Sequence, residues 1–288
     1  MNSRTVLTPF ILSIMLIPFA FAISLGLSSD ATPERIILTL FAETVVVEIL
    51  ALFQVANARK LFSRSDQGYL TWTLILAFLI VRLLAEARLT TMNFGWVPQY
   101  EEDAPSSLIF FYRYVLRYLY TVSDLLFISA LVTTIRSYKS TGLKFELMKQ
   151  DYLYIILLWA MPVITFVFRE NLFSASTGND PYIPTYRLVA VTVGAIIASL
   201  CIVVRRYAVQ MGGGAVASVW NSVVAAGIAR DASFLALALI TPSSRVGAQF
   251  LEQYLLWIFA CCWLMAALYQ REVLPRGKTG SFAAYNAE

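Results

Sequence analysis

The sequence predicts an all-α fold: a polytopic membrane helix bundle of seven to eight transmembrane helices, forming a single integral membrane domain over residues 1–288. Hydrophobic residues make up 59% of the chain and charged residues 14%, and the mean hydropathy is +0.68. A soluble protein carries about 25% charged residues. Apolar stretches of about 20 residues, enough to cross a hydrocarbon core of ~30 Å, recur along the whole sequence.

Eight apolar stretches predict the individual spans, and the short loops between them leave no room for a soluble domain. The spans are approximately 6–27, 36–58, 69–89, 108–134, 152–168, 188–204, 215–240 and 251–269. The first stretch also resembles a signal peptide, because Arg4 precedes it and Ala20-Phe21-Ala22 has the small-residue pattern of a cleavage site. We favour a helix because the apolar run continues beyond Ala22; cleavage would leave seven helices.

Positive charges predict how the spans are oriented. Basic residues follow the second, fourth, sixth and eighth spans, whereas the loop after the third span contains Glu101, Glu102 and Asp103 and no Lys or Arg. Cytosolic loops carry an excess of Lys and Arg. We therefore expect a cytosolic C-terminus and, with eight helices, a cytosolic N-terminus.

Composition also restricts the chemistry. The chain contains no histidine, which excludes histidine-box diiron sites, HExxH proteases, histidine-ligated haem and Ser-His-Asp triads. Cys201, Cys261 and Cys262 lie in apolar runs without a CxxC pair, and no aspartate-rich diphosphate motif is present. We expect no metal and no cofactor. The net charge of +4, with basic residues at span ends, does not indicate a nucleic-acid partner.

Ionisable residues inside the spans are costly in a membrane, so each is a functional hypothesis, with a structural ion pair as the alternative. Glu43 and Glu48 both lie in the second span. Five residues correspond to about 140° around a helix, so the two carboxylates do not share a face. Gln54 returns to the face of Glu43. We interpret Glu43 as the carboxylate that faces a cavity, although the sequence alone leaves the choice between the two open.

The third and fourth spans carry the densest polar pattern. Arg82 and Glu86 have the i, i+4 spacing of an intrahelical ion pair. On the fourth span, spacings of four, three and four place four polar residues on one stripe, namely Arg113, Arg117, Tyr120 and Asp124. Such a stripe cannot face lipid over its length. We expect it to line a cavity or to meet carboxylates on another helix.

The seventh span adds Trp220, Asn221, Arg230 and Asp231. Helix depths place Asp231 in the outer third of the membrane, with Trp220 on the same face, and Asp124 nearer the cytosolic side. The charges as a set predict a polar pocket that opens toward the lumen or the outer leaflet. Loss of water around a carboxyl favours its neutral form and a nearby arginine favours its ionised form, so one pocket can hold both an acid and a carboxylate.

A neutral carboxyl in an aromatic, water-poor cavity suits protonation of an epoxide or an alkene on a lipid-soluble substrate. Aromatic faces stabilise the resulting carbocation as they stabilise other cations. A second carboxylate or a tyrosine can then remove the terminal proton. This chemistry needs no metal.

With these residues the chain resembles the small polytopic terpene cyclases of fungal meroterpenoid pathways, including the ascochlorin and ascofuranone type. The resemblance implies a metal-free enzyme that acts on an epoxidised prenyl chain, with one acid on an early helix and one on a late helix. Glu43 or Glu48 matches the early position and Asp231 the late one. Better-known members carry Trp before the early Glu, where this chain has Ala42 or Val47. We expect the protein in the endoplasmic reticulum membrane, with the bilayer and a prenylated epoxide as its partners.

The candidate site therefore has two parts. The expected catalytic residues are Glu43, Asp231, Glu48 and Asp124. The expected substrate-binding residues are Arg82, Glu86, Arg113, Arg117, Tyr120, Trp220 and Asn221.

Other function classes also fit a small helical membrane protein. A seven-helix receptor is one, although the last span, 251–269, lacks the Lys that retinal binding requires. A small transporter is another, since transporters also place charges at the membrane midplane, but the sequence shows no internal repeat and no matching pair of broken helices. A purely structural polar network is the third alternative.

Overall fold

The computed structural model describes residues 33–93, 118–142, 146–168, 182–210, 214–240 and 245–273. These residues form seven α-helices and no strand, which confirms the predicted all-α class. The first predicted span, 6–27, lies outside the described residues. The helices are α2 (Pro33–Arg59), α3 (Gln67–Asn93), α5 (Tyr118–Ser140), α6 (Lys149–Val167), α8 (Tyr182–Gln210), α9 (Gly214–Ile240) and α10 (Arg245–Val273).

Six of these seven helices are long and apolar enough to cross a membrane. The seventh helix, α9, carries Asn221, Arg230 and Asp231, and its described residues alone do not form such a span. Large apolar side chains cover the outside of the bundle; Phe53 on α2, for example, is 60% exposed and Val163 on α6 is 62% exposed. Together with the apolar helices, an exterior of this kind is typical of a bundle that faces lipid. The chain is therefore a helical membrane protein, as predicted.

The helices extend beyond the predicted spans. The sixth predicted span, 188–204, lies within α8, and the last, 251–269, lies within α10. Hydropathy detects the part that crosses the hydrocarbon, whereas helical hydrogen bonding continues into the polar ends. The fourth predicted span, 108–134, corresponds to α5, which continues to Ser140; the residues before Tyr118 are not described.

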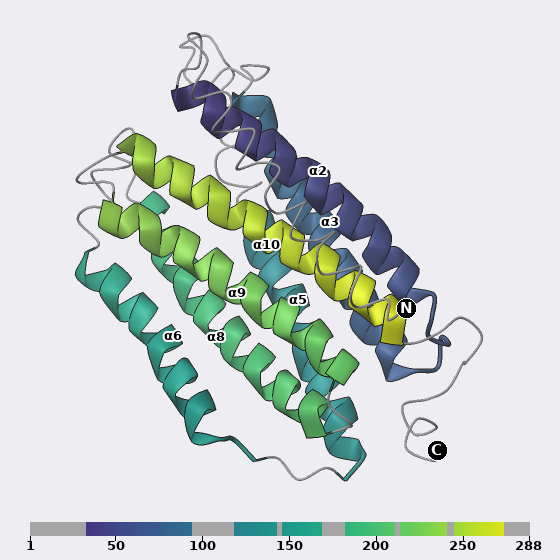
Figure 1. Cartoon of the computed structure of the whole chain (residues 1–288). Coiled ribbons are helices and arrows are strands. Elements are labelled where there is room, and N and C mark those ends of the chain that lie inside the picture. The colour runs from purple at the N-terminus through teal and green to yellow at the C-terminus, as the bar shows by residue number, and fades with distance from the viewer. Residues whose placement is uncertain are drawn as a thin grey trace.

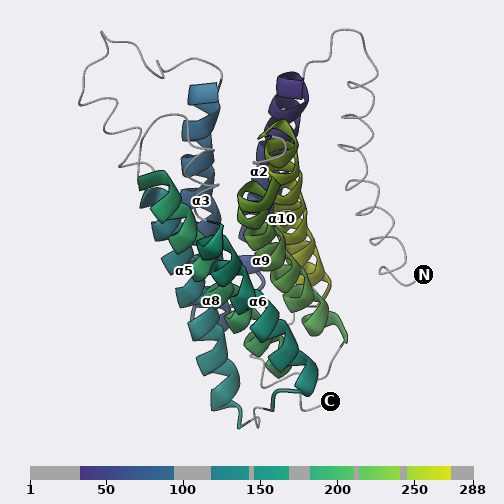
Figure 2. The same cartoon turned by 90° about the vertical axis from the view of Figure 1, so that its left-hand side faces the viewer.

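Six helices form a closed ring in the described part of the chain. In order around the ring, each helix packs against the next: α2, α3, α5, α8, α9, α10 and back to α2. Figure 2 shows the ring as two layers, with α2, α10 and α9 in one and α3, α5 and α8 in the other. Helix α6 lies outside the ring against α8 and α9 (Figure 1).

One end of the bundle collects most of the basic residues that flank the described helices. Helices α2, α5, α8 and α10 end there, and α3, α6 and α9 begin there (Figures 1 and 2). We call it the basic end. Three side-chain contacts join helices near it: Arg206 with Asp151 across α8 and α6, Arg205 with Asn221 across α8 and α9, and Arg271 with Gln54 across α10 and α2.

The ring interior is filled by an aromatic cluster that we call the aromatic plug, formed by Phe78 on α3, Phe127 on α5, and Phe259 and Trp263 on α10. The ring centroids of Phe78 and Phe127 are 4.9 Å apart, and Trp263 lies 5.3 Å from Phe78 and 5.0 Å from Phe127. Because α10 does not neighbour α3 or α5 around the ring, these contacts cross the interior. Each such pair contributes about 0.5–1.5 kcal/mol beyond the burial of its area.

Candidate functional site

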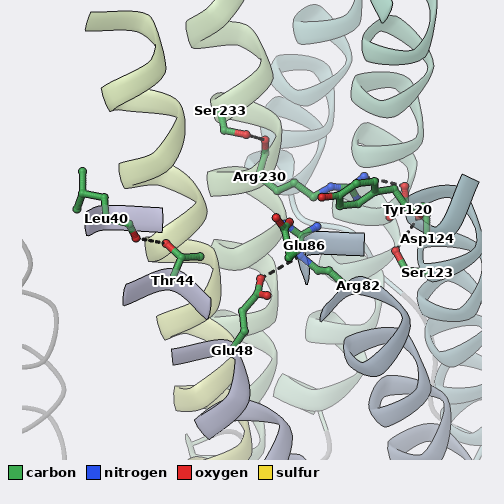
Figure 3. Close-up of polar contacts among 10 residues, drawn as sticks. All are labelled: Leu40, Thr44, Glu48, Arg82, Glu86, Tyr120, Ser123, Asp124, Arg230 and Ser233. Atoms are coloured by element: carbon green, nitrogen blue, oxygen red, sulfur yellow. Dashed lines mark hydrogen bonds and ion pairs between the residues drawn. The ribbon is translucent and has the colours of Figure 1, made fainter. Parts of the chain in front are cut away.

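A buried ionic cluster lies next to the aromatic plug, on the side away from the basic end. Arg82 Nε donates to Glu48 Oε1 at 3.2 Å, and Arg82 Nη2 donates to Glu86 Oε1 at 3.3 Å. Figure 3 shows Arg82 between these two carboxylates. We call these three residues the Arg82 centre. All three are buried, and the predicted pairing of Arg82 with Glu86 is confirmed.

Side chains from three helices, α2, α3 and α10, hold the Arg82 centre in place. Glu86 follows Arg82 by one turn of α3, and Glu48 reaches it from α2. The guanidinium carbon lies 4.2 Å from the centroid of the Phe259 ring, which approaches across the interior from α10. A buried guanidinium is tolerated only when it is paired and hydrogen-bonded. Two carboxylates and a cation–π contact meet that requirement here.

A second ion pair crosses the ring at the same level. Arg230 Nη2 on α9 donates to Asp124 Oδ2 on α5 at 2.7 Å, and both side chains are buried. Tyr120 lies one turn before Asp124, and its ring centroid is 5.8 Å from the guanidinium carbon of Arg82. The two ionic groups are therefore adjacent in one layer, as Figure 3 shows.

This ion pair shows the level of Asp124 within the bundle relative to α9. The sequence predicted Asp124 nearer the cytosolic side than Asp231, but Asp124 bonds to Arg230, the neighbour of Asp231. The helix α5 continues to Ser140, beyond the predicted end of its span. Asp124 consequently lies about as far from the end of α5 as Asp231 lies from the beginning of α9.

Asp231 is placed differently from the other carboxylates. Its residue is 0% exposed, and neither carboxylate oxygen has a hydrogen-bond partner. Consecutive residues on a helix differ by about 100° in direction, so Asp231 does not follow Arg230 across the ring. It lies against α8 instead, where a Cβ added to Gly194 would come within 1.6 Å of Asp231 Oδ1. Its carboxyl thus rests in the space that the side chain at position 194 would occupy.

The two carboxylates of α2, Glu43 and Glu48, also lie in different surroundings. Glu48, not Glu43, joins Arg82, although the sequence favoured Glu43 as the inward-facing residue. Glu43 is only partly buried and lies within electrostatic range of Cys261 on α10; its Oε2 has no hydrogen-bond partner. The five-residue spacing explains why only one of them reaches the Arg82 centre.

Two predicted substrate-binding residues lie elsewhere. Trp220 Nε1 donates to the hydroxyl of Tyr138 at 3.2 Å, and Asn221 is exposed and accepts from Arg205. Both lie toward the basic end, about three turns of α9 away from Asp231. The structure therefore separates them from the ionic layer. Arg113 and Arg117 lie outside the described residues.

Sequence reasoning missed Gly194 and Phe259 as parts of this region. Each had a weak signal: Gly194 is an isolated glycine within an apolar helical stretch, and Phe259 shares a helix face with Trp263 through i, i+4 spacing. Neither signal identifies the partner, because the partner lies on another helix.

No family model, curated protein or solved structure matches the chain. A functional assignment therefore rests on the geometry of this layer. Its described carboxylates are of two kinds: Glu48, Glu86 and Asp124 are paired with arginines, and Asp231 has no partner. Among the described residues, no three Cys, Asp or Glu side chains are grouped to hold a metal ion.

Proposed function

We propose that the chain is a membrane-bound, metal-free terpene cyclase that protonates an epoxidised prenyl chain of a meroterpenoid and closes its ring through a carbocation. The observation that carries the proposal is the Asp231 carboxyl, which is fully buried, has no hydrogen-bond partner, and lies level with a layer of paired carboxylates beside an aromatic plug. A general acid and a carboxylate base in one apolar region are the two groups that the reaction needs.

Asp231 is the proposed acid. An ionised carboxylate that is buried without a hydrogen bond is strongly disfavoured, so the neutral acid is the form that fits this position. Its proton passes to the epoxide oxygen, the carbon–oxygen bond breaks, and the tertiary carbocation is attacked by the nearest alkene. The final cation loses a proton to a carboxylate. Glu48 is the proposed base, because it pairs with Arg82 through Oε1 while its Oε2 has no hydrogen-bond partner. The product is an isomer of the substrate.

The aromatic plug is the proposed stabiliser of the carbocation. The face of Phe259 already lies against a cation, the guanidinium of Arg82. Attraction between a cation and an aromatic face is worth about 0.5–2 kcal/mol per contact, and more when water is absent. A carbocation that forms beside the plug gains the same attraction. The aromatic rings offer it no lone-pair nucleophile that would trap it.

The proposed substrate is a lipid-soluble prenylated epoxide that enters from the bilayer. The exterior of the bundle is apolar, and the ionic layer lies within the membrane-spanning part of the helices. We place the protein in the endoplasmic reticulum with its basic end, and hence its C-terminus, on the cytosolic side, because cytosolic loops are enriched in Lys and Arg.

The test is turnover in microsomes that contain the full chain. An epoxyfarnesyl-phenol is supplied, and mass spectrometry detects a cyclised isomer of unchanged mass. Asp231→Asn should abolish the product, whereas Glu272→Gln, which alters an exposed acid at the basic end of α10, should not. Absence of turnover with every epoxidised prenyl substrate refutes the enzyme. Saturable binding without product would indicate a receptor, and counterflow in vesicles a transporter.

A further inference from the structure

The contact between Asp231 and Gly194 is possible only because position 194 has no side chain. A Cβ at Gly194 would lie 1.6 Å from Asp231 Oδ1, 2.5 Å from Cγ and 2.9 Å from Oδ2. All three atoms of the carboxyl group therefore occupy the place of the missing side chain. We call this place the Gly194 slot.

One turn away, the same helix interface contains a glycine that is not constrained in this way. A Cβ at Gly227 on α9 would meet the Cβ of Ala198 on α8 at 3.5 Å, which is ordinary van der Waals contact. On α8, Ala198 follows Gly194 by one turn. On the antiparallel α9, Gly227 precedes Asp231 by one turn, so the two contacting pairs lie one turn apart. Close helix packing alone therefore does not explain the slot, since a methyl group is accommodated at the neighbouring turn.

No described cation forms an ion pair or a hydrogen bond with the Asp231 carboxyl. Arg230 is the adjacent cation, but its Nη2 is directed to Asp124 across the ring. Asp124 on α5 and Cys201 on α8 are the other ionisable groups in electrostatic range of Asp231. Neither is a cation, and no donor reaches either oxygen. A buried charge without such a partner is strongly disfavoured.

We propose that Gly194 is the positioning residue of Asp231: its missing side chain creates a slot in α8 that holds the carboxyl as a neutral acid, turned away from Arg230. The role of this acid in catalysis rests on the proposed cyclase function, but the slot itself does not. A side chain at position 194 expels the carboxyl toward Arg230, where it ionises and can no longer donate a proton.

Infrared spectroscopy of the purified full chain in nanodiscs tests the slot without any substrate. A neutral carboxyl gives a carbonyl stretch that shifts in heavy water. We expect a band that disappears in Asp231→Asn, is lost in Gly194→Ala and is unchanged in Gly227→Ala, the matched control. Absence of any band that depends on Asp231, or an unaltered band in Gly194→Ala, overturns the proposal.

A double-mutant comparison keeps the proposal testable if Gly194→Ala folds poorly. In the Asp231→Ala background the carboxyl is gone, and the methyl group at position 194 has room. We expect Gly194→Ala to lower the melting temperature in the wild-type background and to leave it unchanged in the Asp231→Ala background. Equal losses in both backgrounds would overturn the slot.

These measurements also separate the slot from the cyclase. A band from Asp231 that depends on Gly194, without turnover of any prenyl epoxide, retains the slot and refutes the function. Turnover that requires Asp231, with no neutral carboxyl band, retains the function and refutes the slot. If both hold, Gly194→Ala should lower kcat at least about 100-fold, since an acid contributes about 10²–10⁴-fold.

Discussion

The Arg82 centre and the Gly194 slot both hold carboxyl groups at one level of the same bundle. The carboxylates of the Arg82 centre have a cationic partner, whereas the carboxyl in the slot has no hydrogen-bond partner. In the Arg82 centre, Glu48 and Glu86 share one guanidinium that Phe259 covers. In the slot, the carboxyl of Asp231 lies against Gly194, and neither of its oxygens has a hydrogen-bond partner. The comparison teaches that the partner, and not the depth, decides whether a buried acid stabilises the fold or remains available for chemistry.

The two regions should therefore respond differently to substitution. Breaking a buried ion pair leaves an uncompensated charge, whereas removing an acid that has no partner leaves nothing unpaired. Stability is expected to depend on the Arg82 centre, and activity on Asp231.

Asp231→Asn is expected to have the largest effect. The amide cannot deliver a proton, so turnover should fall by about 10²–10⁴-fold. The free energy of unfolding should change by less than about 1 kcal/mol, because no hydrogen bond is lost. Product formation in microsomes and melting in detergent measure the two effects. Loss of stability together with activity would contradict the contrast between the two regions.

Arg82→Met should be the most destabilising change. It leaves two buried carboxylates without their cation, which costs about 3–5 kcal/mol. Thermal unfolding in detergent measures the loss, and Arg136→Met, at an exposed position of α5, is the matched control. A melting temperature equal to that of the control would show that the Arg82 centre does not stabilise the bundle.

Phe127→Leu should have a smaller effect. It removes two aromatic contacts of the plug, with Phe78 and Trp263, and is expected to cost about 1–3 kcal/mol. Phe53→Leu, on the exposed face of α2, should cost less than about 0.5 kcal/mol. Unfolding of both variants in the same detergent gives the comparison, and equal losses would contradict a packed interior.

Trp220→Phe should have the smallest effect. It removes one hydrogen bond to Tyr138, worth about 0.5–1.5 kcal/mol, and keeps most of the aromatic volume. Melting in detergent again measures the change. A loss as large as that of Arg82→Met would show that the contacts near the basic end, and not the Arg82 centre, dominate stability.

Local features of this chain could be predicted from the sequence. Hydropathy located the helices, and the i, i+4 spacing of Arg82 and Glu86 identified an ion pair within α3. The five-residue spacing of Glu43 and Glu48 correctly implied that only one of them faces a given neighbour. These features depend on the geometry of a single helix, which the sequence determines.

Contacts between helices could not be predicted. Arg230 meets Asp124 because α9 and α5 face each other across a ring, and their residues are separated by 106 positions. The periodicity of α2 gives the angle between Glu43 and Glu48 but not the rotation of the helix, so the inward residue was misjudged. The contact of Gly194 with Asp231 depends on the register of α8 against α9, which the sequence alone does not give.

The aromatic plug has a consequence for the membrane itself. A bundle with acids and arginines at its centre would offer protons a route between the two aqueous compartments if water filled its axis. Phe78, Phe127, Phe259 and Trp263 occupy that axis between the ionic layer and the basic end. The plug therefore places closely packed aromatic rings, and not a row of polar side chains, between the ionic layer and the basic end.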